Sequence, residues 1–337
     1  MRFCGIDLHS NNCVVVVTDE ADRKLLSRRC RNDLATILSM LEPHREELAG
    51  VVVESTYNWY WLVDGLRAAG YEVKLANTVA MKRYDGLKHS GDEDDAAFLA
   101  HLLRLGILPT GYIHPPAQRA LRDLARKRAQ LVRSRTQHVL SVENILARER
   151  GARLASKAIQ RLNATTVEQL GLGADVSLAV KSSVAVIATL NQEIALLETR
   201  LLKAVKPRPE YALLKSITGI GEVLSIVIML ETGEIGRFAG VGNFASYTRC
   251  VDSAHYSNGK KKGEGNTKNG NVYLAWAFVE AANFARRFSA EAKCFFERKK
   301  ARTNTVIATK ALAHKLARAA YHVLKDRQPF DVKRCFT

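Results

Sequence analysis

Residues 1–31 of this chain read MRFCGIDLHSNNCVVVVTDEADRKLLSRRCR. Three strand-like segments, residues 2–7, 13–18 and 23–27, are separated by the turn signal Asn11-Asn12 and by the polar residues 18–22. Segments of this length and composition, bounded by such short turns, predict strands that pair in antiparallel order. The chain is therefore expected to begin with a three-stranded meander, and not with the strand–helix–strand start of a nucleotide-binding Rossmann unit.

The following segments alternate between helix and strand. Apolar residues at helical spacing predict helices over residues 34–41 and 58–69, and the all-apolar run over residues 49–54 predicts a buried parallel strand. Residues 72–76 predict a further strand, and an acidic helix is expected over residues 92–105. Three strands followed by this alternation is the element order of the ribonuclease H-like fold, a fold of the α/β class.

Four acidic residues are expected to converge in this topology. Asp7 lies at the end of the first strand, and Glu54 ends the buried parallel strand, where a carboxylate needs a partner. Asp92 and Asp95 are three residues apart and share one face of the acidic helix. Carboxylates repel one another unless a cation lies between them, and several around one or two Mg²⁺ ions suit phosphodiester chemistry.

The four acids together therefore favour a metal site, with Asp94 as an alternative to Asp95. The simpler interpretation is a solvated acidic helix N-terminus, which the helix dipole favours without any metal.

Composition narrows the class of protein. The chain has 337 residues, 47% of them apolar, and a formal net charge of +17, which indicates a polyanionic partner such as nucleic acid. The six cysteines are scattered without a Cys-x-x-Cys pair, which indicates reduced thiols in a cytoplasmic protein. No signal peptide and no apolar run of membrane-spanning length is apparent, so no membrane partner is expected.

Proline-rich breaks divide the chain into three expected domains. Pro115-Pro116 and Pro207-Arg208-Pro209 interrupt the helical patterns on either side, which gives domains over residues 1–114, 115–206 and 207–337. The middle domain shows helical spacing, with a long helix over residues 182–204, which predicts either a coiled coil that pairs subunits or a plain helical bundle. Because the net charge is so positive, a nucleic-acid track is favoured over a solvated face for six basic residues: Arg122, Arg126, Lys127, Arg128, Arg133 and Arg135.

Two segments of the last domain suit phosphate binding. Thr218-Gly219-Ile220-Gly221 lies between two predicted helices, which is the helix-hairpin-helix pattern, and backbone N–H groups at Gly219 and Gly221 could approach a phosphate. A plain turn between helices is the alternative. The polar loop over residues 252–271 carries four lysines suited to phosphate oxygens, unless it is a surface loop that binds nothing: Lys260, Lys261, Lys262 and Lys268.

Taken in order, these segments resemble the DEDD-type transposases of bacterial insertion sequences (insertion-sequence family one hundred and ten). The resemblance covers essentially the whole chain. It rests on Gly5-Ile6-Asp7, Val53-Glu54-Ser55-Thr56, Asp92-x-x-Asp95-Ala96, Ile217-x-Gly219-Ile220-Gly221, and Ser257 followed by Thr267-Lys268-Asn269-Gly270-Asn271. In that family a RuvC-like domain is joined by a coiled-coil segment to a mainly helical transposase domain.

The resemblance implies both a reaction and its residues. The DEDD quartet, which binds Mg²⁺ or Mn²⁺, falls on Asp7, Glu54, Asp92 and Asp95. A serine of the C-terminal domain attacks DNA and forms a covalent 5′-phosphoserine link, and Ser257 best matches that serine. Two departures, Asn258 between this serine and Gly259 and the altered residues 248–253, leave Ser253 as the competing candidate.

The resemblance also implies the partners. Members of the family excise and insert their own element between donor and target DNA, guided by a structured RNA that the element encodes. They assemble as homo-oligomers, dimers or tetramers, whose active sites combine domains of different subunits. The resemblance further implies a bacterial cytoplasmic protein associated with the nucleoid.

The residues alone leave two other functions open. One is a metal-only nuclease or Holliday junction resolvase, in which water attacks and no covalent intermediate forms. The other is a basic nucleic-acid-binding protein whose acids only cap helices. A convergent quartet argues against the second, since four acids weaken binding to a polyanion unless a metal neutralises them.

Overall fold

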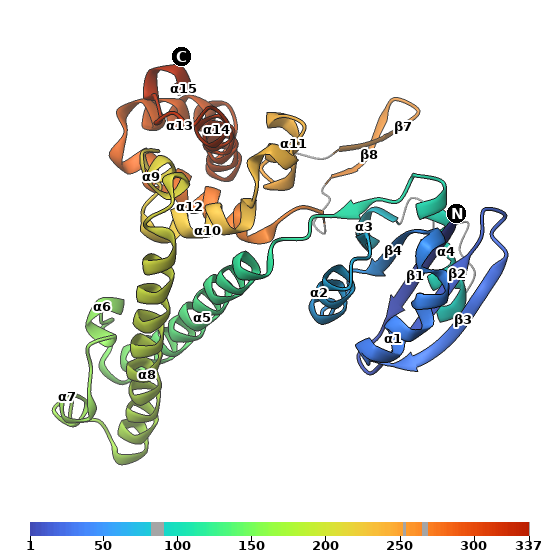
Figure 1. Ribbon diagram of the computed structural model, residues 1–337. Helices are drawn as coiled ribbons and strands as arrows, with labels where there is room; N and C mark the ends of the chain where they lie inside the picture. The colour runs from blue at the N-terminus through green and yellow to red at the C-terminus, as the bar shows by residue number, and fades with distance from the viewer. Residues whose placement is uncertain (82–90, 252–253, 265–268, 337) are drawn as a thin grey trace. The chain divides into compact units, whose positions relative to one another are not determined.

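A computed structural model (Figure 1) describes residues 1–81, 91–251, 254–264 and 269–336. The chain forms two compact units, Met1–Pro116 and Ala117–Thr337. The first unit contains a mixed sheet with helices, and the second is mostly helical. The finer division of the second unit at residue 207 stays a prediction.

The first unit is built on a six-stranded sheet of order β3-β2-β1-β4-β5-β6. Antiparallel pairing joins β1, β2 and β3, and parallel pairing joins β1, β4 and β5, so the predicted meander and buried parallel strand are confirmed. The short edge strand β6, antiparallel to β5, was not predicted. The strands are β1 (Arg2–Leu8), β2 (Asn12–Thr18), β3 (Lys24–Arg31), β4 (Leu48–Glu54), β5 (Val73–Ala76) and β6 (Thr110–Gly111).

Side-chain alternation along β1 separates the two faces of the sheet. Cys4, Ile6 and Leu8 belong to the larger core, together with side chains of α1 and α2. Gly5 belongs to the opposite face, where α4 packs. Asp7, two residues further along the strand, lies on that same face. The helices of this unit are α1 (Leu34–Leu41), α2 (Tyr60–Ala68), α3 (Thr78–Met81) and α4 (Asp92–Arg104), with the 3₁₀ helix η1 (Glu42–Glu47).

The second unit is an assembly of helices around two cores. The larger core gathers side chains of α5 and α8–α14, and the smaller one joins α5 and α8 to two short helices. The helices are α5 (Pro116–Arg150), α6 (Ser156–Ile159), α7 (Ala164–Glu168), α8 (Ala174–Val205), α9 (Pro209–Lys215), α10 (Glu222–Thr232), α11 (Val241–Tyr247), α12 (Val272–Phe288), α13 (Ala290–Arg302), α14 (Thr305–Asp326) and α15 (Val332–Phe336). A hairpin of β7 (Ala254–Ser257) and β8 (Lys260–Glu264) lies between α11 and α12 in the sequence.

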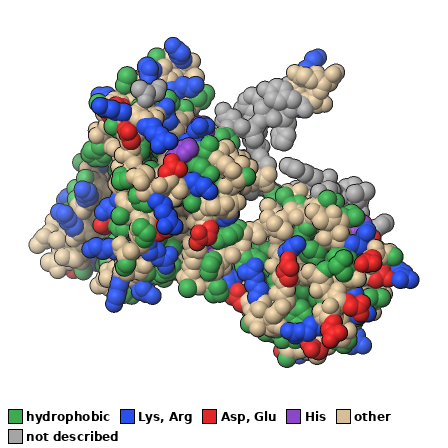
Figure 2. Space-filling view, turned by 45° about the horizontal axis from the view of Figure 1, so that its top comes forward, with side chains coloured by type: hydrophobic (Ala, Val, Ile, Leu, Met, Phe, Trp, Pro, Cys, Tyr) green, Lys and Arg blue, Asp and Glu red, His purple; other side chains and the backbone are tan. Residues whose placement is uncertain are grey.

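The basic residues of α5 do not form the predicted nucleic-acid track. Arg122 is buried, and only Lys127 and Arg133 of the six are exposed. The other three bind side chains of neighbouring helices: Arg126 to Glu231, Arg128 to Glu198, and Arg135 to Asn191. The last two contacts show that α5 and α8 run antiparallel. Figure 2 shows further Lys and Arg side chains spread over the visible surface of the helical unit.

The helix α8 departs from the expectation that no stretch reaches membrane-spanning length. By length and composition it could cross a membrane: an 18-residue window has a mean hydropathy of 1.2, and 17% of that window is buried. The helix also contributes Val184 and Ile187 to the smaller core and Leu201 to the larger one. Such packing is typical of a core helix in a helical protein, which passes the same length and composition test.

Gly5 sets the distance between β1 and α4. A Cβ atom at this position would lie 1.9 Å from the Ala96 carbonyl oxygen and 2.9 Å from the Ala100 nitrogen. We therefore expect Gly5→Ala to destabilise the first unit by about 3 kcal/mol, because the helix must move away from the sheet. The midpoint of urea unfolding measures this loss. Gly50→Ala is the matched control, since its Cβ would keep an ordinary 3.4 Å distance from the Glu72 carbonyl oxygen. Equal midpoints for both variants would contradict the role assigned to Gly5.

Candidate active site

Asp7 is a buried carboxylate at the centre of the first unit. It is 3% exposed and lies near the end of β1, between β2 and β4. The parallel register pairs Ile6 with Val53, so Glu54 follows at the same end of the neighbouring strand. The predicted adjacency of these two strand ends is therefore observed.

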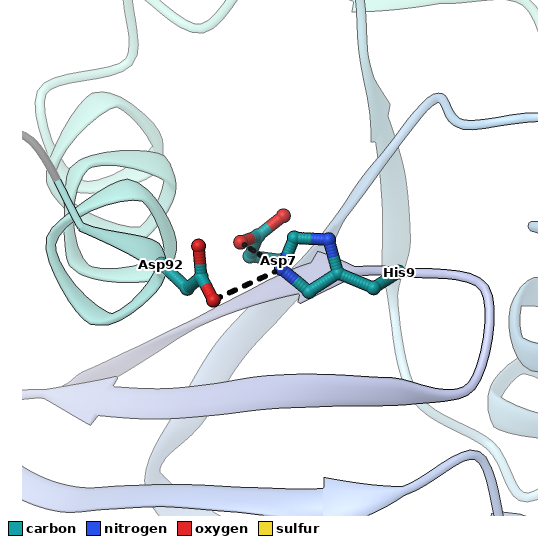
Figure 3. Close-up of side chains that lie close together, drawn as sticks. All are labelled: Asp7, His9 and Asp92. Atoms are coloured by element: carbon teal, nitrogen blue, oxygen red, sulfur yellow. Dashed lines mark ion pairs between the residues drawn. The ribbon is translucent and has the colours of Figure 1, made fainter.

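Asp92, the first residue of α4, reaches the same point. The imidazole Nε2 of His9 lies 3.2 Å from an oxygen of Asp7 and 3.2 Å from an oxygen of Asp92. Figure 3 shows the ring directed toward both carboxylates. The three side chains offer ligand atoms that all lie within 4.8 Å of one another. Two carboxylates and an imidazole at this spacing fit a divalent cation by the chemistry of their donor atoms.

Arg29 of β3 also contacts this group. Its guanidinium donates to the Asp92 carboxylate and to Oδ1 of Asn12, the latter at 2.9 Å. The hydrogen bond from Arg29, aided by His9, lowers the pKa of Asp92 below its usual value. A lowered pKa keeps this carboxyl group charged to more acidic pH, which is the form that binds a cation.

The other two acids of the expected quartet lie beside this group but outside it. Glu54 and Asp95 are both half-buried, and Asp95 lies one turn after Asp92 on α4. Among the described His, Cys, Asp and Glu side chains, Asp7, His9 and Asp92 are the one set of three or more whose ligand atoms all lie within 4.8 Å of one another. Asp94, the alternative to Asp95, lies 3.4 Å from the Lys24 ammonium group and is satisfied there.

Two members of this site, His9 and Arg29, were not predicted from the sequence. His9 follows Asp7 by two residues, just beyond the strand end, and this spacing was its available signal. Arg29 was missed because the third strand was predicted to end at residue 27, whereas β3 continues to Arg31. In β3, Arg29 is the register partner of Val14, which is itself the partner of Asp7 in β1.

Ser257 lies at the tip of the β7–β8 hairpin. It is paired directly with Lys260 across the two-residue turn Asn258-Gly259. Both turn residues have positive φ, 49° and 70°, which is the type I′ geometry favoured by Asn-Gly. Residues 257–260 are all exposed, so the Ser257 hydroxyl and the Lys260 ammonium group are open to a ligand.

The remaining residues predicted for nucleic-acid binding are placed unevenly. Lys262 is exposed in β8, and Lys261 belongs to the same strand, whereas Ser253 and Lys268 lie outside the described residues. A sequence signal for the hairpin existed, since Asn-Gly between two short polar runs is a strong two-residue turn signal. The polar composition of the segment led instead to its prediction as a loop.

The segment between α9 and α10 joins two helices, as predicted. Gly219 has φ +95°, and a Cβ there would lie 2.4 Å from the Ala281 carbonyl oxygen of α12. Close packing against α12 thus accounts for this glycine by itself. A Cβ at Gly221 would meet nothing within 4 Å, so its backbone at the start of α10 is open. Phosphate binding at these glycines stays a prediction.

Comparison with known protein families identifies two regions of this chain. Residues 4–149 match the transposase family of the DEDD type named for IS110, and residues 211–297 match the transposase family described as IS116/IS110/IS902. No curated protein matches the chain. The first match covers the acidic group with α5, and the second covers the glycine turn and the Ser257 hairpin. Both matches name this transposase family and together they cover most of the chain, so this chain belongs to the IS110 family of transposases.

Proposed function

We propose that this transposase excises and inserts its own insertion sequence by attack of Ser257 on a DNA phosphodiester, assisted by a metal ion at the acidic group. The observation that carries the proposal is the convergence of Asp7 and Asp92 on one point, from a strand and a helix far apart in the sequence. The strand order β3-β2-β1-β4-β5 around this point supports a ribonuclease H-like, RuvC-like domain. DNA is the substrate class that the family implies.

The metal would be held by Asp7 and Asp92, with Glu54 and Asp95 within reach as further carboxylates. The DEDD-type domain implies a divalent metal, and carboxylate oxygens favour Mg²⁺ or Mn²⁺. An ion held there would supply Lewis-acid chemistry, polarising a phosphoryl oxygen and offsetting charge that develops during cleavage. His9 lies against both carboxylates, so its imidazole either joins the ligands or orients them through hydrogen bonds.

Ser257 and Lys260 supply complementary chemistry at the hairpin tip. In the proposed step the Ser257 oxygen forms a bond to phosphorus, the bond from phosphorus to the 3′ oxygen breaks, and the serine proton passes to solvent or to the leaving oxygen. The products are a 5′-phosphoserine link and a free 3′ hydroxyl. Lys260, paired directly opposite, places an ammonium group where it can offset the phosphate charge.

Guidance by RNA is part of the same proposal. Within the described residues, the exposed lysines of the hairpin suit a phosphate backbone, which carries no base sequence. A guide RNA encoded by the element would supply the sequence choice by base pairing with donor and target DNA. The bacterial cytoplasm, near the nucleoid, is where both partners are found.

The second candidate is a metal-only nuclease or Holliday junction resolvase. It is favoured by one observation, that Asp7, His9 and Asp92, the group that could hold a metal ion among the described residues, all belong to the first unit. In that case a water molecule attacks, and Ser257 has no chemical role.

Removal of either carboxylate tests the metal site. Asp7→Asn and Asp92→Asn should each lower Mg²⁺-dependent cleavage of end-labelled donor DNA at least about 100-fold, because a ligand is lost. DNA binding should be equal or tighter, since one negative charge is removed. Asp94→Asn is the control. Asp94 belongs to the same turn of α4 as Asp92, but its carboxylate contacts the Lys24 ammonium group of β3. Undiminished cleavage by both test variants would show that the acids are not a metal site.

The covalent link tests the serine. Protein, element-encoded RNA, Mg²⁺ and end-labelled DNA are incubated and then denatured, and label retained on protein is measured. Ser257→Ala should reduce retained label to background, whereas Ser253→Ala should retain it, because the hydroxyl at residue 257 is the attacking group. Loss with Ser253→Ala only would move the nucleophile by four residues. Cleavage without retained label in the parent would favour the metal-only nuclease.

Oligomers would use the exposed side of α8. Leu178 and Leu196 are 68% and 63% exposed and lie 18 residues apart, which is five helical turns and hence one side of the helix. We propose that this side packs against a second copy. Leu196→Glu should shift the mass measured by light scattering toward the monomer, because a charge is buried in the interface. Ala188→Glu, also exposed but about a quarter-turn away, should leave the mass unchanged. A parent that is monomeric throughout would refute this interface.

A further inference from the structure

Glu231 is a carboxylate buried in the larger core of the helical unit. It is 2% exposed and lies one residue before the end of α10, in a run of nine consecutive buried residues. A buried carboxylate is costly unless charged or polar groups satisfy it. Nothing in the proposed chemistry uses this residue, so its presence needs another explanation.

Three hydrogen bonds satisfy Glu231. The Arg126 guanidinium of α5 donates to both carboxylate oxygens, at 2.6 and 2.7 Å. The side-chain amide of Asn271 donates to Oε2 at 2.7 Å. Burial opposes the charge of Arg126, but the hydrogen bond and the charge of Glu231 outweigh it and raise the pKa of the guanidinium. The group is therefore a fixed ion pair with one additional neutral donor.

Asn271 connects this ion pair to the segment that carries Ser257. Its side-chain oxygen caps α12 by accepting from the backbone nitrogens of Tyr273 and Leu274, at 2.9 and 3.1 Å. Its backbone nitrogen donates to the Tyr247 carbonyl oxygen at 2.6 Å, which ties the end of α11 to the start of α12. With the bond to Glu231, the Asn271 amide has a fixed orientation.

The two ends of the Ser257 segment meet at this point. Arg249, just after α11, donates to the Gly270 carbonyl oxygen at 3.1 Å. Gly270 has φ +82°, and a Cβ there would lie 2.6 Å from the Tyr247 carbonyl oxygen. The chain can therefore return beside α11 only through a glycine, immediately before Asn271. Arg249 and Asn271 thus fix the two ends of the segment, residues 250–270, that includes the β7–β8 hairpin.

Stability of the fold alone is a weak explanation for the buried group of Glu231, Arg126 and Asn271. Well-packed apolar residues often replace a buried ion pair with equal or greater stability, whereas a satisfied polar network fixes one arrangement of its neighbours. The neighbours here are α5, α10 and the base of the hairpin segment. The cation of Arg126 also lies 4.5 Å from the Tyr273 ring centroid, so α5 contacts both sides of the Asn271 cap.

We propose that Glu231 is a positioning residue for the Ser257 hairpin, which it anchors through Asn271 and couples to α5 through Arg126. The proposal rests on the serine chemistry proposed above, and it assigns Glu231 no contact with DNA. Arg126 of α5 and Asn271, where the hairpin segment ends, bind the same carboxylate. The orientation of α5 therefore affects where the Ser257 hydroxyl lies.

The test separates placement from binding and folding. Glu231→Gln keeps the shape of the side chain and removes its charge, and Asn271→Ser keeps a helix-capping hydroxyl but is too short to reach Glu231. Each should slow formation of the covalent protein–DNA link at saturating DNA about 100-fold, the size expected from a misplacement of about 1 Å. The dissociation constant for DNA should change less than about threefold, which is an effect that general unfolding would not produce.

Glu198→Gln is the matched control. It removes the charge from another half-buried ion pair of α5, in which Arg128 contacts Glu198 of α8 instead of Glu231 or Asn271. Its rate of link formation should stay within about threefold of the parent. A parent-like rate for Glu231→Gln and Asn271→Ser would overturn the proposal, as would equal slowing by all three variants.

Hydrogen exchange provides a readout that needs no DNA. Backbone amides in peptides covering residues 247–274 should exchange about tenfold faster in Glu231→Gln and Asn271→Ser, because the Asn271–Tyr247 bond is loosened. Unchanged exchange in both variants would overturn the anchoring role. Cleavage without any covalent link in the parent would instead refute the serine function, and the exchange result would still decide whether Glu231 anchors this segment.

Discussion

Direct contact between a helix backbone and a glycine controls the geometry of the first unit. At Gly5 the carbonyl oxygen of Ala96 occupies the place of a side chain, so α4 lies closer to β1 than any other residue would allow. Asp7 lies two residues beyond that contact on the strand, and Asp92 lies one turn before it on the helix. The same device recurs in the second unit, where Gly219 lies against Ala281 of α12. Of the two contacts, the one at Gly5 sets the distance between the strand that carries Asp7 and the helix that carries Asp92.

Accessibility gives the Asp92 and Glu231 carboxylates different roles, because the Asp92 side chain is 37% exposed and the Glu231 side chain only 3%. Asp92 contacts the His9 imidazole and the Arg29 guanidinium, whose side chains are 39% and 55% exposed, so water and other cations compete for the same oxygens. Glu231 is paired with a guanidinium through two short hydrogen bonds inside a core, where exchange requires the helices to separate. The first arrangement suits reversible metal binding, and the second suits permanent positioning.

The sequence was sufficient wherever local pattern decides structure. Local pattern predicted the meander, the parallel strand, both ends of α1 and the start of α4, whose end differs by one residue, and the topology then predicted that Asp7 and Asp92 converge. Prediction from the sequence failed where a side chain binds a residue far away in the chain. Arg126 was assigned to a nucleic-acid track because its partner Glu231 is 105 residues away, which no local pattern reveals. The β7–β8 hairpin was missed because its composition is that of a loop, although Asn258-Gly259 specifies the turn.

Net charge of +17 is therefore a poor guide to where DNA is bound. The pairs on α5 remove cations from the surface, whereas Lys260 and Lys262 of the hairpin and the last turn of α13 keep theirs exposed. If DNA is bound at the hairpin, as proposed, counterion release by these lysines would favour its backbone there, beside the proposed nucleophile. The acidic group repels the same backbone until a cation neutralises it, and the Arg29 guanidinium offsets only part of that charge. Metal binding at the acids would thus decide whether a phosphate can reach them at all, before any chemistry begins.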